Sequence, residues 1–86
     1  MKTIYNYPAP LADRISIPMP EGAEVLTVQI QHGYPHIWAL VDPEAPIRDR
    51  SFLCRGTEHP ADGLGRYVGT VQFAGGTLVF HYFETV

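Results

Sequence analysis

The sequence has few of the residues that stabilise small domains through covalent bonds or metals. It contains a single cysteine, Cys54, which cannot form a disulfide within the chain and leaves no cysteine cluster for zinc. It also has only one lysine and no apolar run long enough to cross a membrane. We therefore expect a domain without metal or cofactor, whose stability depends on packing of its own side chains.

The length of 86 residues fits one domain, residues 1–86, because domains usually need roughly 100–200 residues. No N-terminal apolar segment resembles a signal peptide, and the lack of disulfides is typical of the cytoplasm, so we expect a soluble cytoplasmic protein. A chain this short buries only about 60–65% of its unfolded surface. We therefore expect a homo-oligomer, at least a dimer. A compact monomer stabilised by ten aromatic residues is the alternative.

Glycine and proline interrupt the chain throughout. There are eight of each, and no stretch free of both exceeds ten residues. Interior proline costs a helix about 3 kcal/mol and glycine about 1 kcal/mol. The spacing therefore excludes long helices and predicts an all-β fold, a small antiparallel β-sandwich or partly open barrel of about seven short strands. The expected strands are Thr3–Tyr7, Arg14–Ile17, Glu24–Gln31, His36–Val41, Ser51–Arg55, Arg66–Phe73 and Thr77–Glu84. We also expect a short helical turn at Pro46–Arg50.

Two segments, residues 22–33 and 65–76, resemble each other at an offset of half the chain length. The identical positions are Gly22/Gly65, Val25/Val68, Thr27/Thr70, Val28/Val71, Gln29/Gln72 and Gly33/Gly76. Each segment ends in a glycine turn, at His32-Gly33 or Gly75-Gly76, which predicts two similar hairpins at equivalent places in the two halves. Duplication, convergent hairpin chemistry and chance are the alternative explanations of this pseudo-repeat.

Alternation of side chains gives each hairpin an apolar face and a mixed face. In the first hairpin the expected pairs are Gln31 with Tyr34, Gln29 with His36, Thr27 with Trp38 and Val25 with Leu40. In the second, Thr70 lies opposite His81. The expected core residues are Leu26, Val28, Ile30, Pro35, Ile37, Ala39 and Val41, then Val71, Phe73, Leu78, Phe80 and Tyr82. The mixed faces are either solvated sheet surface or a ligand or subunit surface, with His36, Trp38, His81 and Phe83 as interface residues.

The sequence carries no catalytic motif. It lacks a Gly-x-Ser-x-Gly elbow and a phosphate-binding loop. His32 and His36 have metal-pair spacing only on a helix, whereas here they straddle a turn. Cys54 lies in an expected strand, where an inert buried thiol is usual. We therefore predict a protein that is not an enzyme and binds no metal.

Basic residues are concentrated in one region. The net charge of −3 argues against binding of long nucleic acid. Four of the six basic residues nevertheless lie in residues 47–66. Arginine, hydroxyl and imidazole groups can hold phosphate, and aromatic rings can stack on a base. The expected ligand site comprises Arg50, Arg55, Thr57, His59 and Arg66, with Trp38, Tyr34 or Tyr67 as the stacking ring. Alternatively, the arginines neutralise Asp49, Glu58 and Asp62 in exposed pairs.

Several segments together resemble a family of small uncharacterised phage and prophage proteins. They are Lys2–Tyr5, Met19–Leu26, Trp38–Pro43, Gly56-Thr57 with His59-Pro60, and Gly75–His81. The resemblance covers nearly the whole chain and carries no catalytic residue. It implies a small phage accessory protein in the cytoplasm of the bacterial host, where such proteins often act against host defence.

Composition and resemblance together give one hypothesis and two rivals. The hypothesis is a non-enzymatic counter-defence protein that sequesters a small anionic, cyclic nucleotide immune signal. The first rival is an inhibitor that binds a host defence protein through an aromatic-rich sheet face. The second is a structural accessory protein of the virion. Only nucleotide sequestration requires the arginines to converge with an aromatic ring in a concave site.

Overall fold

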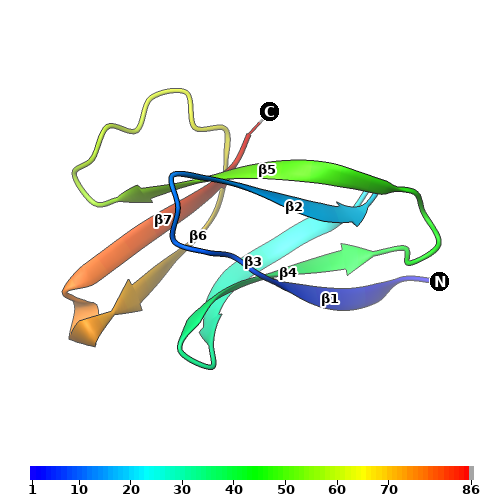
Figure 1. Ribbon diagram of the computed structural model, residues 1–86, viewed down its shortest axis with the longest axis horizontal. Coiled ribbons are helices and arrows are strands. Elements are labelled where there is room, and N and C mark those ends of the chain that lie inside the picture. The colour runs from blue at the N-terminus through cyan, green and yellow to red at the C-terminus, as the bar shows by residue number, and fades with distance from the viewer. Residues whose placement is uncertain (86) are drawn as a thin grey trace.

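The computed structural model describes residues 1–85, which form seven β-strands in two antiparallel sheets (Figure 1). The elements are β1 (Thr3–Pro8), β2 (Arg14–Pro20), β3 (Glu24–Gln31), β4 (Tyr34–Val41), β5 (Ile47–Gly56), β6 (Arg66–Phe73), the 3₁₀ turn η1 (Ala74–Gly76) and β7 (Leu78–Glu84). Sheet A has the strand order β1-β4-β3, and sheet B has the order β2-β5-β7-β6. The all-β prediction is confirmed, and the sheets stay open instead of closing into a barrel.

The expected helical turn at Pro46–Arg50 is wrong. Residues 47–50 begin β5, where Ile47 pairs with Pro20 and Arg50 pairs with Ile17 of β2. Strand β2 continues past its expected end at Ile17 because it lies at the edge of sheet B. Its prolines therefore need not donate ladder hydrogen bonds. Pairing between strands overrides the local preference around Pro46.

The first hairpin has the expected register near its turn and a shifted register farther away. Thr27 pairs with Trp38, as predicted, but Val25 pairs with Ala39 instead of Leu40, because a β-bulge lies between Val25 and Thr27. One extra residue reverses the direction of the side chains around it. Leu26, expected in the core, is therefore 43% exposed, and Val25 packs against the core.

The second hairpin repeats this arrangement. Thr70 pairs with His81 as expected, a bulge lies between Tyr67 and Gly69, and η1 forms the turn. Strands β5-β7-β6 of sheet B follow the same order as β1-β4-β3 of sheet A, so the pseudo-repeat extends to the architecture, with β2 added. Ile30 and Leu78 are exposed, contrary to expectation, because both lie near hairpin turns.

Both sheets contribute to one core. Its buried members are Ala9, Ile15, Ile17, Met19, Ala23, Val28, Ile37, Ala39, Val41, Phe52, Cys54, Val71 and Tyr82. Val28 and Val71 are buried, whereas Gln29 and Gln72 are exposed, as the alternation predicts. The side chains of Tyr34 and Trp38 therefore point away from this core, whereas Val25 and Val68 of the expected mixed faces pack against it.

Strands β3 and β6 meet where the two sheets approach each other, at Gly69. A Cβ atom at Gly69 would lie 2.7 Å from Cγ1 of Val28. We expect Gly69→Ala to lower the free energy of unfolding by about 1–3 kcal/mol, because extra volume in a packed contact forces neighbours to move. Urea denaturation measures the loss. The double variant that combines Gly69→Ala with Val28→Ala should lose less stability than the sum of the losses in the two single variants. Additive losses would contradict a direct contact.

Candidate functional site

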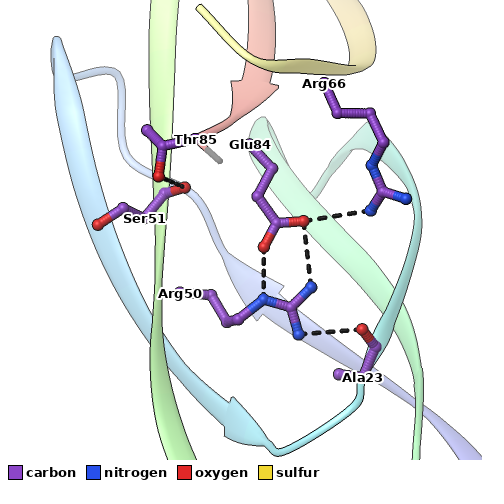
Figure 2. Close-up of polar contacts among 6 residues, drawn as sticks. All are labelled: Ala23, Arg50, Ser51, Arg66, Glu84 and Thr85. Carbon is purple, nitrogen blue, oxygen red and sulfur yellow. Dashed lines mark hydrogen bonds and ion pairs between the residues drawn. The ribbon is translucent and has the colours of Figure 1, made fainter.

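Two of the predicted ligand arginines surround a buried carboxylate (Figure 2). The guanidinium group of Arg50, in β5, binds both oxygens of Glu84 at the end of β7: Nε donates to Oε2, and Nη2 donates to Oε1 at 3.1 Å. Arg66, at the start of β6, donates from Nη2 to the same Oε1 at 3.2 Å. Arg50 Nη1 also donates to the carbonyl of Ala23 at 2.9 Å. Because Ala23 directly precedes β3, Arg50 links sheet B to sheet A.

This cluster differs from the expected pairing of arginines with nearby acids. Arg50 and Arg66 are paired with Glu84, and Arg48 forms an exposed pair with Glu21. Glu84 is only 8% exposed. Sequence reasoning missed it because its partner Arg50 is 34 residues away. The sequence does contain one signal. Glu84 continues the alternating series of Phe80 and Tyr82, and this series places its carboxylate on the core side of β7.

The third predicted arginine also has partners within the chain. Arg55 Nη1 donates to the carbonyl oxygens of Asp13 and Cys54, at 3.1 and 3.0 Å. Trp38 and Tyr34 lie on the outer side of sheet A, whereas Arg50 points toward the interior from sheet B. The structure therefore does not bring the arginines together with these two aromatic rings.

A chain of hydrogen bonds joins other predicted residues on the outer side of sheet B. His81 Nε2 lies 2.8 Å from the hydroxyl of Thr57, and its Nδ1 lies 2.9 Å from the hydroxyl of Thr70. The Thr70 hydroxyl also bonds Tyr67, whose ring packs edge-on against Phe83 at a centroid distance of 5.5 Å. Both nitrogens of His81 are therefore engaged within the chain. Thr57 in turn anchors the start of the connection between β5 and β6.

The remaining predicted ligand residue, His59, lies in this same connection. Its imidazole covers Gly56, where an added Cβ would be 2.9 Å from the ring. His59 also borders a cavity of about 240 Å³. The lining residues are Gly56, Thr57, His59, Thr77, Leu78, Val79 and Phe80. The structure thus places Thr57 and His59 together, without an arginine in the lining of this cavity.

An aromatic row of Tyr34, His36 and Trp38 follows the outer face of β4. The ring centroids of Tyr34 and His36 are 4.9 Å apart, and those of His36 and Trp38 are 6.0 Å apart. His36 Nδ1 lies 3.1 Å from the carbonyl of Tyr34. Asn6 and Gln31 hydrogen-bond to each other across β4 at 2.7 Å, and His36 is only 8% exposed. His36 is therefore a packed member of the row, between its two more accessible neighbours.

Polar groups of the aromatic row differ from those on sheet B in their hydrogen bonding. Within residues 1–85, neither the Tyr34 hydroxyl nor the Trp38 indole N–H has a side-chain hydrogen-bond partner, and Tyr34 is 46% exposed. The expected interface set is divided between the sheets. His36 and Trp38 lie on the outer face of sheet A, whereas His81 and Phe83 lie on that of sheet B. The structure does not bring these four residues into one surface.

Cys54 lies in the core and has a thiol of low reactivity. Burial raises its pKa, and this effect is partly offset by the Tyr82 hydroxyl and by Arg55. Burial also raises the pKa of Tyr82, whose hydroxyl donates to the carbonyl of Ala9 at 3.0 Å. Because the thiolate is the reactive form, a raised pKa favours the unreactive thiol. No group of three or more His, Cys, Asp or Glu residues within residues 1–85 is placed to hold a metal ion.

These features define a small two-sheet β domain with one exposed aromatic residue on the outer face of each sheet, Tyr34 on sheet A and Tyr67 on sheet B. The chain belongs to the family described as a domain of unknown function, DUF7352, whose model matches residues 1–86. No curated protein and no solved structure matches the chain. The family match confirms the expected membership of an uncharacterised family. Across residues 1–85, no helix has the length and apolar character needed to span a membrane.

Proposed function

We propose that the protein is a non-enzymatic accessory protein of phages or prophages that binds a host defence protein through the aromatic row. The proposed setting is the cytoplasm of the bacterial host, and the phage context rests on the sequence resemblance alone. The observation that supports protein binding is the accessible pair of unpartnered donors, the Tyr34 hydroxyl and the Trp38 indole N–H. Amphipathic rings with free polar ends are typical of protein interfaces.

The surroundings of the aromatic row support a protein partner over a charged small molecule. Ile4, which is 56% exposed, pairs with Leu40 beside the row, and Leu26 is turned outward by its bulge. Glutamine and threonine side chains of β3 lie opposite the three aromatic residues. A contact area with apolar and neutral hydrogen-bonding groups suits a protein surface.

Nucleotide sequestration has weaker support from the geometry and stays a prediction. A phosphate bound by Arg50 or Arg66 would compete with the carboxylate of Glu84, which already binds both guanidinium groups. The stacking rings of Trp38 and Tyr34 also face away from these arginines. Homo-oligomer formation and a structural role in the virion likewise stay predictions.

The test measures how well the protein protects an infecting phage from a defence system carried by the bacteria. It compares the wild-type protein with two variants. We expect Trp38→Ala to abolish protection and to weaken binding of the purified defence protein by about 2 kcal/mol or more, as at an interface hot spot. Leu78→Ala is the matched control, because Leu78 is 51% exposed and lies at the tip of the other hairpin. It should retain full protection and affinity.

Two outcomes would contradict the proposal. Full protection by Trp38→Ala would exclude the aromatic row as the binding surface. Loss of protection by Arg55→Ala, with Trp38→Ala still active and both variants folded, would favour the anionic ligand.

A further inference from the structure

An open apolar groove of about 530 Å³ lies at one edge of the sandwich. It lies between β1 and β2, which are edge strands of sheets A and B and are joined by a short connection (Figure 1). Its lining residues are Tyr7, Pro8, Pro10, Ile15, Ser16, Ile17 and Pro18. Neither the aromatic row nor the Arg50–Glu84–Arg66 cluster contributes a residue to it.

Prolines weaken the backbone along this groove as a template for an added β-strand. Cys54 N–H donates to the carbonyl of Asp13, and antiparallel alternation then directs the backbone groups of Ser16 and Pro18 away from β5. The bond from Ala9 N–H to the carbonyl of Pro35 likewise directs the backbone of Pro8 away from β4. Proline has no N–H. Of these three outward-facing positions, only Ser16 can donate a ladder hydrogen bond. The same alternation directs the N–H groups of Asn6 and Arg14 outward, so the prolines disfavour pairing with another chain only along the groove itself.

The chemistry of the lining restricts the ligand further. None of the seven lining residues carries a charge, so the groove offers no counter-ion to a charged group. Among the lining residues only Tyr7 and Ser16 have hydroxyl groups, and alternation places the Ser16 side chain on the opposite face of β2 from Ile15 and Ile17. The Tyr7 hydroxyl is protonated at neutral pH as in any tyrosine, and burial and the neighbouring Tyr5 raise its pKa further. The volume lies in the range of small-molecule sites, roughly 300–1,000 Å³.

We propose that this groove binds a small, uncharged and predominantly apolar molecule. The isoleucines, the prolines and the Tyr7 ring contact its apolar body. The outward-facing backbone N–H of Ser16 and the Tyr7 hydroxyl are the groups that can pair with a single polar substituent. The neutral lining matches an uncharged ligand, and the prolines at both edges disfavour the main alternative, an extended peptide strand. This site is independent of the proposed binding through the aromatic row.

The experiment titrates the purified chain with the neutral fluorescent probe N-phenyl-1-naphthylamine. We expect saturable binding of one probe per chain, with enhanced and blue-shifted emission. Ser16→Asp should weaken this binding by about tenfold or more, because it places a charge beside the apolar ligand. Gln72→Asp introduces the same charge on the exposed outer face of sheet B and should leave the affinity unchanged. Circular dichroism verifies that both variants fold.

Three results would overturn the proposal. The first is absence of saturable binding. The second is equal affinity of the folded Ser16→Asp variant and the wild-type protein. The third is an increase in the fraction of chains that bind the probe when the protein is diluted, together with dissociation of a dimer in sedimentation. That result would show that a second copy of the chain occupies the groove at higher concentration. Trp38→Ala should bind the probe normally, which separates this test from that of the aromatic row.

Discussion

Glu84→Ala should lower the free energy of unfolding by about 3 kcal/mol or more, because it leaves Arg50 partly buried without its counter-ion. Arg50 has only 21% of its side chain exposed and also holds the carbonyl of Ala23. The variant therefore loses the bidentate pair and strains the link between the sheets. The loss would be a large part of the about 5–10 kcal/mol expected for a small domain. Urea denaturation followed by circular dichroism measures it.

Arg66→Ala is the matched control for this prediction. Its guanidinium group bonds the same carboxylate, but 60% of its side chain is exposed. Exposed ion pairs contribute only about 0–1 kcal/mol, so this variant should lose little stability. Replacing Arg50 and Glu84 together by methionine should restore much of the stability lost in Glu84→Ala, because apolar groups of similar size can replace a buried pair. Equal losses in Glu84→Ala and Arg66→Ala would show that burial of Arg50 does not matter.

The strands were predictable where side-chain alternation is regular. The bounds of β3 and β6 follow from alternation between glycine turns, and the burial of Val28 and Val71 follows from the same pattern. The bulge that exposes Leu26 could not be predicted from the sequence. It changes the register between β3 and β4, but the sequence of β3 carries no signal of this change. The incorrect prediction of a helical turn at Pro46–Arg50 has a similar origin, because residues 47–50 begin β5. Its residues are in a strand because β2 pairs with them.

The candidate site was predictable only in part. Alternation places Tyr34 and Trp38 on the outer face of β4, and this prediction is confirmed. The low exposure of His36 was not predictable, because Asn6 and Gln31 meet across β4 from strands far apart in the sequence. The roles of the arginines depend on Glu84 in the same way. Charge clustering along the sequence identified donors, but the fold decides which carboxylate they bind.

The second large effect is expected at Gly65, which ends the connection between β5 and β6. Its φ of +95° lies in the region that favours glycine, and an added Cβ would be 2.2 Å from the carbonyl oxygen of Glu84. We expect Gly65→Ala to cost about 3 kcal/mol or more, because backbone strain of about 1–2 kcal/mol adds to a clash with main-chain atoms. Moving the backbone at Glu84 to relieve the clash would also disturb its pairing with Arg50. Urea denaturation measures the loss.

Gly63→Ala separates the clash from the strain. Gly63 has a φ of +66° and no atom within 4 Å of an added Cβ, so only the strain of about 1–2 kcal/mol applies there. Gly65→Asn provides a second comparison, because asparagine tolerates positive φ better than alanine but carries the same Cβ. It should remain nearly as unstable as Gly65→Ala. Equal losses in Gly63→Ala and Gly65→Ala would mean that the backbone at Glu84 yields readily. The end of β7 would then not be fixed by its ion pair with Arg50.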